Sequence, residues 1–296
     1  MTQPVPSALM PPTPEPPARR LPEGSVDCHV HLVAGRDDFP LWDGRVEDPA
    51  PGPDFDGWLD LYRAHLAALG CSGGLIVHSI LYGGDNAVTL AAVRRMGPGF
   101  RGVGLLPDGA DTAALDAFAE AGMVAVRLNY VHGGLLSWEG ARAMAPALAE
   151  RGMHLQMLAH SDRHMQEIAA DVRALPCPVV FDHLGWPADE MSPDTPGFQA
   201  LCALLAEGHA YVKLSAPYRM AHAPYAETDA CAAALIAANP DACLWGSDWP
   251  HLMLGGAAQP RLPDLVAAIE RVIPDDATRQ KIFVDTPRRL FGLDPA

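Results

Sequence analysis

Positive charge and long hydrophobic runs are scarce in this sequence. Of its 296 residues, 21 are Lys or Arg and 36 are Asp or Glu, which gives a formal net charge of −15. A mean field of that sign repels phosphate backbones and anionic lipid surfaces, so we expect no nucleic-acid partner and no membrane partner. No apolar run approaches the roughly 20 residues that span a bilayer, and no secretory signal is expected at the amino terminus.

Cysteine is also sparse, with six residues and no C-x-x-C pair. We therefore expect reduced, mostly buried thiols and a cytoplasmic location. Only 19% of the residues are charged and 49% are hydrophobic, which indicates a packed globular protein and not a disordered one. The length alone is compatible with one large α/β barrel or with two smaller domains.

Proline is concentrated in residues 1–24, where its density prevents regular helix or sheet, so this segment is predicted to be an extended arm that packs on the body or on a partner subunit. No spacer or shift of composition divides residues 25–296, which we interpret as a single domain. The acidic, proline-rich stretch 37–56, with Phe39 and Trp42, is predicted to be an active-site loop, because irregular segments of that length in compact domains usually have a function.

Apolar runs alternate with helical periodicity along the rest of the chain. Strands are predicted at 25–31, 74–79, 100–106, 123–128, 154–158, 178–183, 209–215 and 243–247. Helices are predicted between them at 58–69, 86–96, 112–121, 138–151, 163–174, 197–207 and 225–239, with a terminal helical region at 262–291. Eight strands, each followed by helix, predict an α/β fold of the (β/α)8 TIM-barrel type with a parallel sheet.

Polar residues end most of the predicted strands. In chain order they are His29 and His31, His78 and Ser79, Arg127 and Asn129, Gln156, Asp182 and His183, Lys213 and Ser215, and Asp248. Active-site residues in such barrels lie at the carboxyl ends of the strands. Buried polar groups cost free energy unless they are paired, so these side chains are expected to pair with one another or with a ligand. The sequence therefore predicts one active site at this rim.

Two of these residues form an H-x-H pair on a strand. His29 and His31 share one face because strand side chains alternate with period two. A bare H-x-H pair is also common among ordinary surface and core histidines, and the later segment W-G-S-D-W-P-H at 245–251 gives it weight.

The segments D-C-H-V-H at 27–31, F-D-H-L-G-W-P at 181–187 and W-G-S-D-W-P-H at 245–251 resemble the amidohydrolase superfamily, as do Y-G-G-D-N at 82–86 and R-L-N at 127–129. The resemblance is strongest to its lactone-hydrolase branch, which includes the 2-pyrone-4,6-dicarboxylate lactonases, and extends from about residue 22 to 290. It implies an enzyme that opens the lactone ring of a small organic acid, of the 2-pyrone, muconolactone or sugar-acid type.

The resemblance also implies roles for individual residues. Asp248 matches the general base that takes a proton from the attacking water. His29, His31 and His183 match histidines that either ligate a metal or polarise the lactone carbonyl without one. The expected substrate-binding residues are Arg127, Asn129, Arg219, His78, Ser79, Tyr82, Gln156, Trp186, Ser215 and His251.

Two metal states stay open. One is a single divalent ion, with zinc expected, on His29, His31, His183 and Asp248, and the other is no metal at all, which the resemblance favours. A binuclear centre is not expected, because Gln156 stands where many two-metal relatives have histidine and the fourth strand lacks a bridging lysine or glutamate.

The chain departs from a dicarboxylate lactonase at two positions. The segment V-H-G-G at 131–134 and Trp186 replace basic residues, so fewer carboxylates can be neutralised in the pocket. We expect a carboxylate-bearing lactone with an apolar or ring-bearing part against Trp186. Two rivals stay open, a metal-dependent decarboxylase of the same superfamily and a non-catalytic sugar-acid binder. The sequence does not decide whether the chain forms a homo-oligomer.

Overall fold

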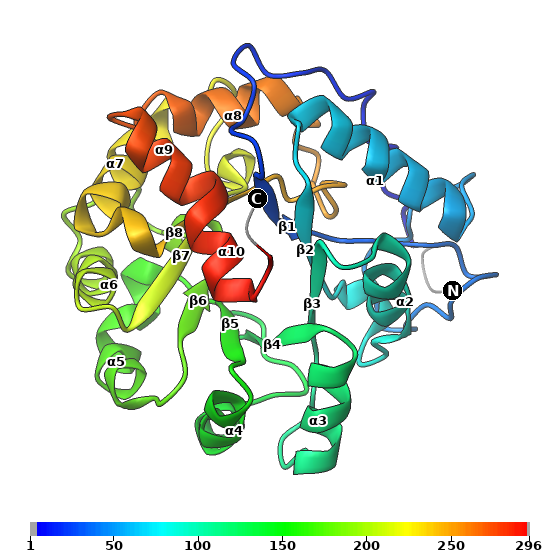
Figure 1. The fold of residues 1–296 in the computed structure, drawn as a ribbon, viewed down its shortest axis with the longest axis horizontal. Helices are drawn as coiled ribbons and strands as arrows, with labels where there is room; N and C mark the ends of the chain where they lie inside the picture. Colours follow the sequence, from blue (N-terminus) through cyan, green and yellow to red (C-terminus); the bar gives the residue numbers. More distant parts are fainter. Residues whose placement is uncertain (1–4, 295–296) are drawn as a thin grey trace.

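The computed structural model describes residues 5–294, and its centre is a barrel of eight parallel strands (Figure 1). The strands are β1 (Val26–Val30), β2 (Gly73–Val77), β3 (Phe100–Gly104), β4 (Met123–Asn129), β5 (His154–Leu158), β6 (Val179–Phe181), β7 (Ala210–Ser215) and β8 (Cys243–Gly246). Each strand pairs with the next one in the sequence. The predicted (β/α)8 barrel is confirmed, and the strand bounds differ from the predicted ones by two residues or fewer.

Helices surround the barrel. They are α1 (Phe55–Leu69), α2 (Ala87–Met96), α3 (Thr112–Glu120), α4 (Trp138–Glu150), α5 (Ser161–Ala174), α6 (Pro196–Ala206), α7 (Asp229–Ala238), α8 (Leu262–Glu270), α9 (Asp276–Gln280) and α10 (Thr286–Phe291). Side chains of Asp54, Asp111, Ser137 and Thr195 accept a backbone N–H in the first turn of α1, α3, α4 and α6. The predicted terminal helical region at 262–291 is confirmed, and it consists of several helices with a break between α8 and α9, where Asp275 caps α9.

The seam between β1 and β8 closes the barrel. The backbone N–H of Asp248 donates to the His29 carbonyl at 2.8 Å, and that of His31 donates to the Trp249 carbonyl at 2.7 Å. The buried carboxylate of Asp27 accepts both the backbone N–H of Ser247 at 2.8 Å and its hydroxyl at 2.6 Å. These bonds fix the end of β8 against the end of β1.

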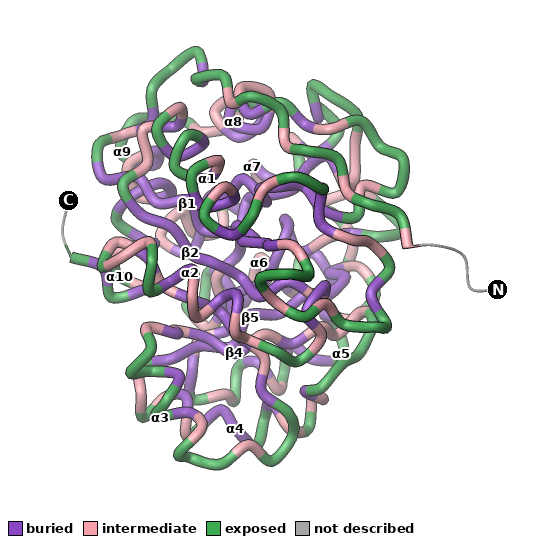
Figure 2. Tube along the Cα trace, turned by 90° about the vertical axis from the view of Figure 1, so that its right-hand side faces the viewer, coloured by how far each residue is buried: buried purple, intermediate pink, exposed green. Residues whose placement is uncertain are grey.

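The hydrophobic core has two parts. The larger part lies between the strands and the helices, and the smaller part fills the barrel. The buried residues are concentrated along the central strands, and the exposed ones lie mostly at the periphery (Figure 2). Phe291 and Leu293, from α10 and the residues after it, pack with Val26 and Leu75 in the smaller part. They close the amino-terminal end of the barrel, which leaves the opposite end for the site.

The proline-rich arm runs along the body of the barrel within residues 5–24, and its first four residues lie outside the described part. Ala8 and Asp48 are joined by a backbone hydrogen bond of 2.8 Å, and Glu15 pairs with Arg261 at 2.6 Å. The arm therefore contacts both the predicted active-site loop and the segment before α8.

No helix between residues 5 and 294 has the length and apolarity that crossing a membrane requires. The six cysteines are free thiols, as expected.

Substitution of Gly246 tests how closely β8 packs against β1, because a Cβ at this position would lie 2.7 Å from the His29 backbone nitrogen. We expect Gly246→Ala to lower the free energy of unfolding by about 1–3 kcal/mol, since β8 must move away from β1. Urea denaturation measures the change. Gly35→Ala is the matched control, because a Cβ there meets nothing within 4 Å, and an equal effect of the two substitutions would contradict a tight seam.

Candidate active site

A cavity of ≈ 840 Å³ lies at the carboxyl ends of the strands. Eight residues predicted for the site line it, namely His31, His78, Ser79, Arg127, Asn129, His183, Trp186 and Arg219. The predicted active-site loop also lines it, through Trp42, Arg45 and Val46. The strand-end argument therefore located the cavity correctly, and most of its polar wall.

Three predicted catalytic side chains converge beneath this cavity. The Nε2 atoms of His29 and His31 are 3.3 Å apart, and the Oδ1 atom of Asp248 lies 3.6 Å from the first and 3.5 Å from the second. His29 and Asp248 are fully buried, while His31 reaches the cavity wall. The seam between β1 and β8 thus produces this triangle of two nitrogens and one oxygen.

The outer contacts of the two rings indicate which nitrogens carry protons. Nδ1 of His31 lies 2.9 Å from the Val77 carbonyl, which can only accept, so Nδ1 is protonated and Nε2 of the neutral ring holds a lone pair. Nδ1 of His29 lies 3.2 Å from Oδ1 of Asp182. When Nδ1 donates to this carboxylate, Nε2 of His29 also presents a lone pair to the triangle.

The two oxygens of Asp248 have different surroundings. Oδ2 accepts from the Tyr218 hydroxyl at 2.5 Å and from the Arg219 guanidinium at 3.0 and 3.1 Å, whereas Oδ1 is buried without a hydrogen-bond partner. Burial alone would raise the pKa of Asp248, but the Arg219 charge beside it helps to hold this pKa well below its usual range. Asp248 is therefore an ionised carboxylate with one free oxygen.

This triangle fits a single divalent metal ion. Zinc bonds of about 2.1 Å at tetrahedral angles place ligand atoms about 3.4 Å apart, close to the three distances here. Each imidazole has an acceptor on its outer nitrogen, as metal-bound histidines usually do. His183, also predicted as a ligand, is not part of this group and belongs to a second one with His29 and Asp182.

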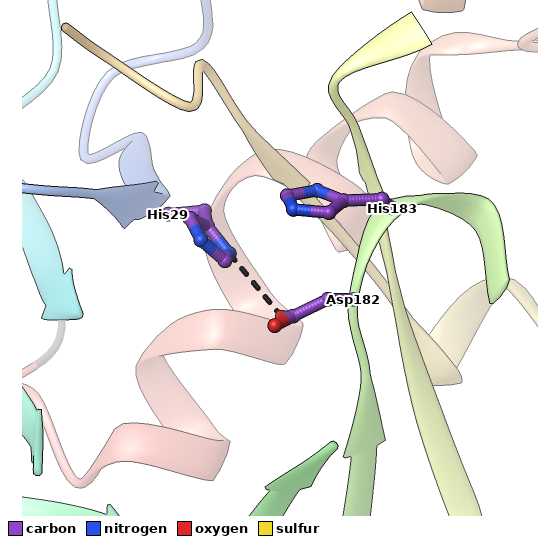
Figure 3. A group of neighbouring side chains, drawn as sticks. All are labelled: His29, Asp182 and His183. Atoms are coloured by element: carbon purple, nitrogen blue, oxygen red, sulfur yellow. Dashed lines mark ion pairs between the residues drawn. The ribbon is translucent and has the colours of Figure 1, made fainter. Parts of the chain in front are cut away.

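The second group differs from the triangle in that a cation already lies beside it. Figure 3 shows His29 and Asp182 directed toward each other, with the His183 ring beside them. Nζ of the buried Lys213 lies 3.2 Å from Nδ1 of His29 and 3.4 Å from Oδ1 of Asp182. An ammonium group therefore balances the Asp182 carboxylate here, so a second cation would be held less strongly.

Lys213 and Asp182 belong to a buried polar network beneath the triangle. The Lys213 ammonium donates to Oε1 of Gln156 at 2.6 Å, and the amide of Gln156 donates to Oδ2 of Asp182 at 3.1 Å. Burial favours protonated Asp182, yet the Lys213 charge outweighs burial and holds the pKa of Asp182 well below its usual range. Burial also lowers the pKa of Lys213 to about 8.

His183 stands at the cavity wall on a strained turn. His183, Leu184, Gly185 and Trp186 all have positive φ, from 37° to 72°, and three of the four are not glycine. The hydroxyl of Ser215 lies 2.9 Å from Nδ1 of His183 and orients the ring. Burial lowers the pKa of His183 to about 4, so its imidazole is neutral near pH 7.

Four residues predicted to bind substrate do not line the cavity. The Tyr82 hydroxyl bonds to the backbone N–H and carbonyl of Ala34 at 2.6 and 2.8 Å. Gln156 and Ser215 are buried partners of Lys213 and His183. His251 is buried on the far side of Tyr218, with ring centroids 5.5 Å apart. These side chains support the site from behind the wall.

Asp182 and Lys213 lie at predicted strand ends, but no role was predicted for either of them. Tyr218 and Arg45 were not among the predicted site residues. The residue pattern of β7 does indicate the direction of the Lys213 side chain. Lys213 and Ser215 alternate with Val212 and Leu214, which pack in the outer core, so the lysine had to face the barrel interior. Tyr218 and Arg45 lie on irregular segments, where no periodicity indicates direction.

Single and double substitutions of Lys213 and Asp182 test the buried network. We expect Lys213→Met and Asp182→Asn each to lower the free energy of unfolding by about 3–5 kcal/mol, because each leaves the other charge buried and less well compensated. The double variant should lose less than the sum of the two. Chemical denaturation of all four proteins gives the coupling.

Lys281→Met is the matched control, since Lys281 pairs with Asp241 at 2.7 Å on the surface. Its expected cost is below about 1 kcal/mol. Strict additivity of the Lys213 and Asp182 substitutions would contradict the network.

Comparison with known proteins agrees with this geometry. The amidohydrolase family profile matches residues 26–293. The chain is 32% identical to a 4-sulfomuconolactone hydrolase of Rhizobium radiobacter, over 92% of this chain and 91% of the relative. It is 28% identical to a 2-pyrone-4,6-dicarboxylate hydrolase of Comamonas testosteroni, over 94% and 93%. It is 27% identical to a D-galactarolactone isomerase of Agrobacterium fabrum, over 93% of each.

Solved structures share the fold. An apo crystal structure from Agrobacterium tumefaciens superimposes with a TM-score of 0.80 at 25% identity, over 95% of this chain and 100% of the other. An amidohydrolase from Burkholderia multivorans that was crystallised with bound zinc gives a TM-score of 0.66 at 20% identity, over 91% and 99%. The family profile and the relatives together show that this chain belongs to the amidohydrolase family.

Proposed function

We propose that this protein hydrolyses the lactone ring of a small carboxylate-bearing substrate. The observation that carries the proposal is the free Oδ1 atom of Asp248, a buried and ionised oxygen beside two imidazole nitrogens at the base of a cavity. Ester hydrolysis needs a group that takes a proton from water and a polar surface that stabilises the developing oxyanion. Both are available at this end of the barrel.

The relatives favour this reaction over the decarboxylase alternative. Two are named for a lactone, and the third is named for a pyrone, which is a cyclic ester. One of the three is an isomerase, so a lactone substrate is shared more widely than hydrolysis itself. The relatives also disfavour a sugar-acid binder without catalysis, because all three are named as enzymes.

The proposed reaction begins when the lactone carbonyl enters the cavity between His31 and His183. Asp248 accepts a proton from the attacking water at Oδ1, while Tyr218 and Arg219 hold Oδ2 and fix the carboxylate plane. His183 is neutral, and when Ser215 donates to its Nδ1, its Nε2–H can donate to the carbonyl oxygen. Collapse of the tetrahedral adduct then breaks the ring C–O bond, the proton held by Asp248 passes to the leaving ring oxygen, and a hydroxy acid or its tautomer is released.

His29, His31 and Asp248 would hold the divalent metal ion that the family implies. When bound, such an ion supplies Lewis-acid polarisation and lowers the pKa of water. Asp182 and Val77 keep the two imidazoles oriented, whatever occupies the triangle.

The carboxylate of the substrate is assigned to the side of the cavity formed by β2 and β4. Arg127, Asn129 and Ser79 line it there. The Arg127 guanidinium donates to the His78 carbonyl at 3.0 Å and lies 3.6 Å from Asp182, so it is fixed in place before a ligand arrives. The proposal extends to a cytoplasmic location, which the free thiols support.

Asp248→Asn tests the proposed general base. We expect kcat for lactone opening to fall by at least about a thousandfold, because an amide oxygen cannot take a proton from water. A panel of γ- and δ-lactones assayed by pH-stat measures the loss. Asp60→Asn, a surface carboxylate control, should leave the rate unchanged, and full activity of Asp248→Asn would rule out the assigned role.

The metal triangle is tested by elemental analysis. We expect about one equivalent of zinc per chain after equilibration with zinc and gel filtration. His31→Ala should lose the ion, while His209→Ala, which lies outside the triangle, should keep it. Zinc retained equally by both variants, or no zinc in the unchanged protein, would contradict the assignment.

A further inference from the structure

Four large apolar side chains are exposed around the mouth of the active-site cavity. They are Trp42, Val46, Leu135 and Met253, with exposed fractions of 47%, 66%, 47% and 38%. We call these four residues the apolar mouth. Among the described residues, the other large hydrophobic side chains with comparable exposure are Leu9 and Met10 on the arm, and neither lines the cavity.

The apolar mouth comes from three separate loops. Trp42 and Val46 precede α1, Leu135 precedes α4, and Met253 follows β8. Exposed apolar side chains that gather from distant parts of a chain around one opening indicate a binding surface. Their position at the entrance of the cavity makes them part of the same site.

Glycines hold two of these side chains in place. A Cβ at Gly83 would lie 2.8 Å from the Trp42 ring and one at Gly44 would lie 2.5 Å from it, so the indole packs directly on both backbones. A Cβ at Gly84 would lie 2.5 Å from Cδ1 of Leu135. The side chains of Trp42 and Leu135 are therefore held by the backbone beneath them while their outer faces stay exposed. Because they are already ordered, less side-chain conformational entropy is lost when a ligand binds.

The size of the cavity exceeds the needs of a bare lactone acid. Cavities of roughly 300–1,000 Å³ hold drug-sized ligands, and this one measures ≈ 840 Å³. A single five- or six-membered ring with one carboxylate would leave most of that volume empty. The remaining space lies next to the apolar mouth.

The charges on the cavity wall argue against a second anionic group. Two of its three guanidinium groups each face a carboxylate of their own, with N–O distances of 2.5 Å for Arg45 and Asp48 and 3.0 Å for Arg219 and Asp248. Arg127 lies 3.6 Å from Asp182, but Lys213 already balances that carboxylate, so Arg127 is left to match a single anionic group of a ligand. A dianionic ligand would therefore enter without a matching excess of positive charge.

We propose that the substrate is a lactone with one bulky apolar substituent, aryl or branched alkyl, and with no more than one anionic group. The substituent lies against the apolar mouth while the ring reaches His31 and His183. This inference rests on the proposed lactone hydrolysis and specifies its substrate class. It separates this chain from the relative whose name specifies a dicarboxylate.

The test compares γ-phenyl-γ-butyrolactone with γ-methyl-γ-butyrolactone and with 2-pyrone-4,6-dicarboxylate. Each kcat/KM is divided by the rate constant of that compound with hydroxide, which removes differences of intrinsic reactivity. We expect the phenyl compound to exceed the methyl compound by about 30-fold, the factor for burying roughly 80 Å² more apolar surface. The dicarboxylate should be the poorest of the three.

Variants show whether the preference comes from the apolar mouth. Trp42→Ala and Leu135→Ser should each reduce the phenyl-to-methyl ratio by at least about fivefold. Leu9→Ser removes an exposed leucine from the arm and should leave the ratio unchanged. A ratio near one in the unchanged protein, or a ratio unaffected by both mouth variants, would overturn the inference while the proposed lactonase activity stands.

A binding measurement separates failure of the inference from failure of the proposed function. Calorimetry with 5-phenyl- and 5-methyl-2-pyrrolidinone, the corresponding lactams, reports affinity without turnover. Tighter binding of the phenyl lactam by about tenfold or more, without opening of any lactone, would overturn hydrolysis and retain the ligand class. Equal or absent binding of the two lactams would overturn the ligand class.

Discussion

The contact between the first and the last strand of the barrel determines the site. β1 and β8 are joined by two backbone hydrogen bonds at their carboxyl ends and by the Asp27 carboxylate on Ser247. Gly246 permits the close approach, because any side chain there would meet the backbone of His29. A barrel that closed less tightly would separate the Asp248 oxygen from the two imidazoles. The geometry of the triangle formed by His29, His31 and Asp248 is therefore a consequence of how the sheet closes.

The fold and most of the cavity wall were predictable because they follow from periodicity. Alternating apolar runs located eight strands, and parallel strands place their carboxyl ends together, so His31, Arg127 and His183 had to share one rim. It was harder to predict which polar side chains face the cavity and which form hydrogen bonds within the protein behind the cavity wall. Tyr82 and His183 are both polar residues after strands, yet the Tyr82 hydroxyl turns to the Ala34 backbone, and no pattern of residue types encodes that choice.

Residues on irregular segments were beyond a sequence argument for a physical reason. The direction of Tyr218 and Arg45 depends on turns stabilised by contacts between distant parts of the chain, such as the bond from Arg45 to the Trp42 carbonyl. The expected scarcity of cations did not include Arg45, which adds a guanidinium to the cavity wall, where Asp48 lies 2.5 Å from it. The number of charged residues in the sequence is therefore a poorer guide to the charge of the cavity than the number that lack an oppositely charged neighbour in the structure.

The buried ammonium of Lys213 changes how the site responds to its surroundings. A metal ion held at a second position would come and go with its own dissociation constant, and its occupancy would vary with the supply of free metal. A lysine side chain is covalently part of the protein, so its amine is present at a fixed stoichiometry and is not removed by chelators. The oriented pair of His29 and Asp182 is thereby made independent of metal concentration.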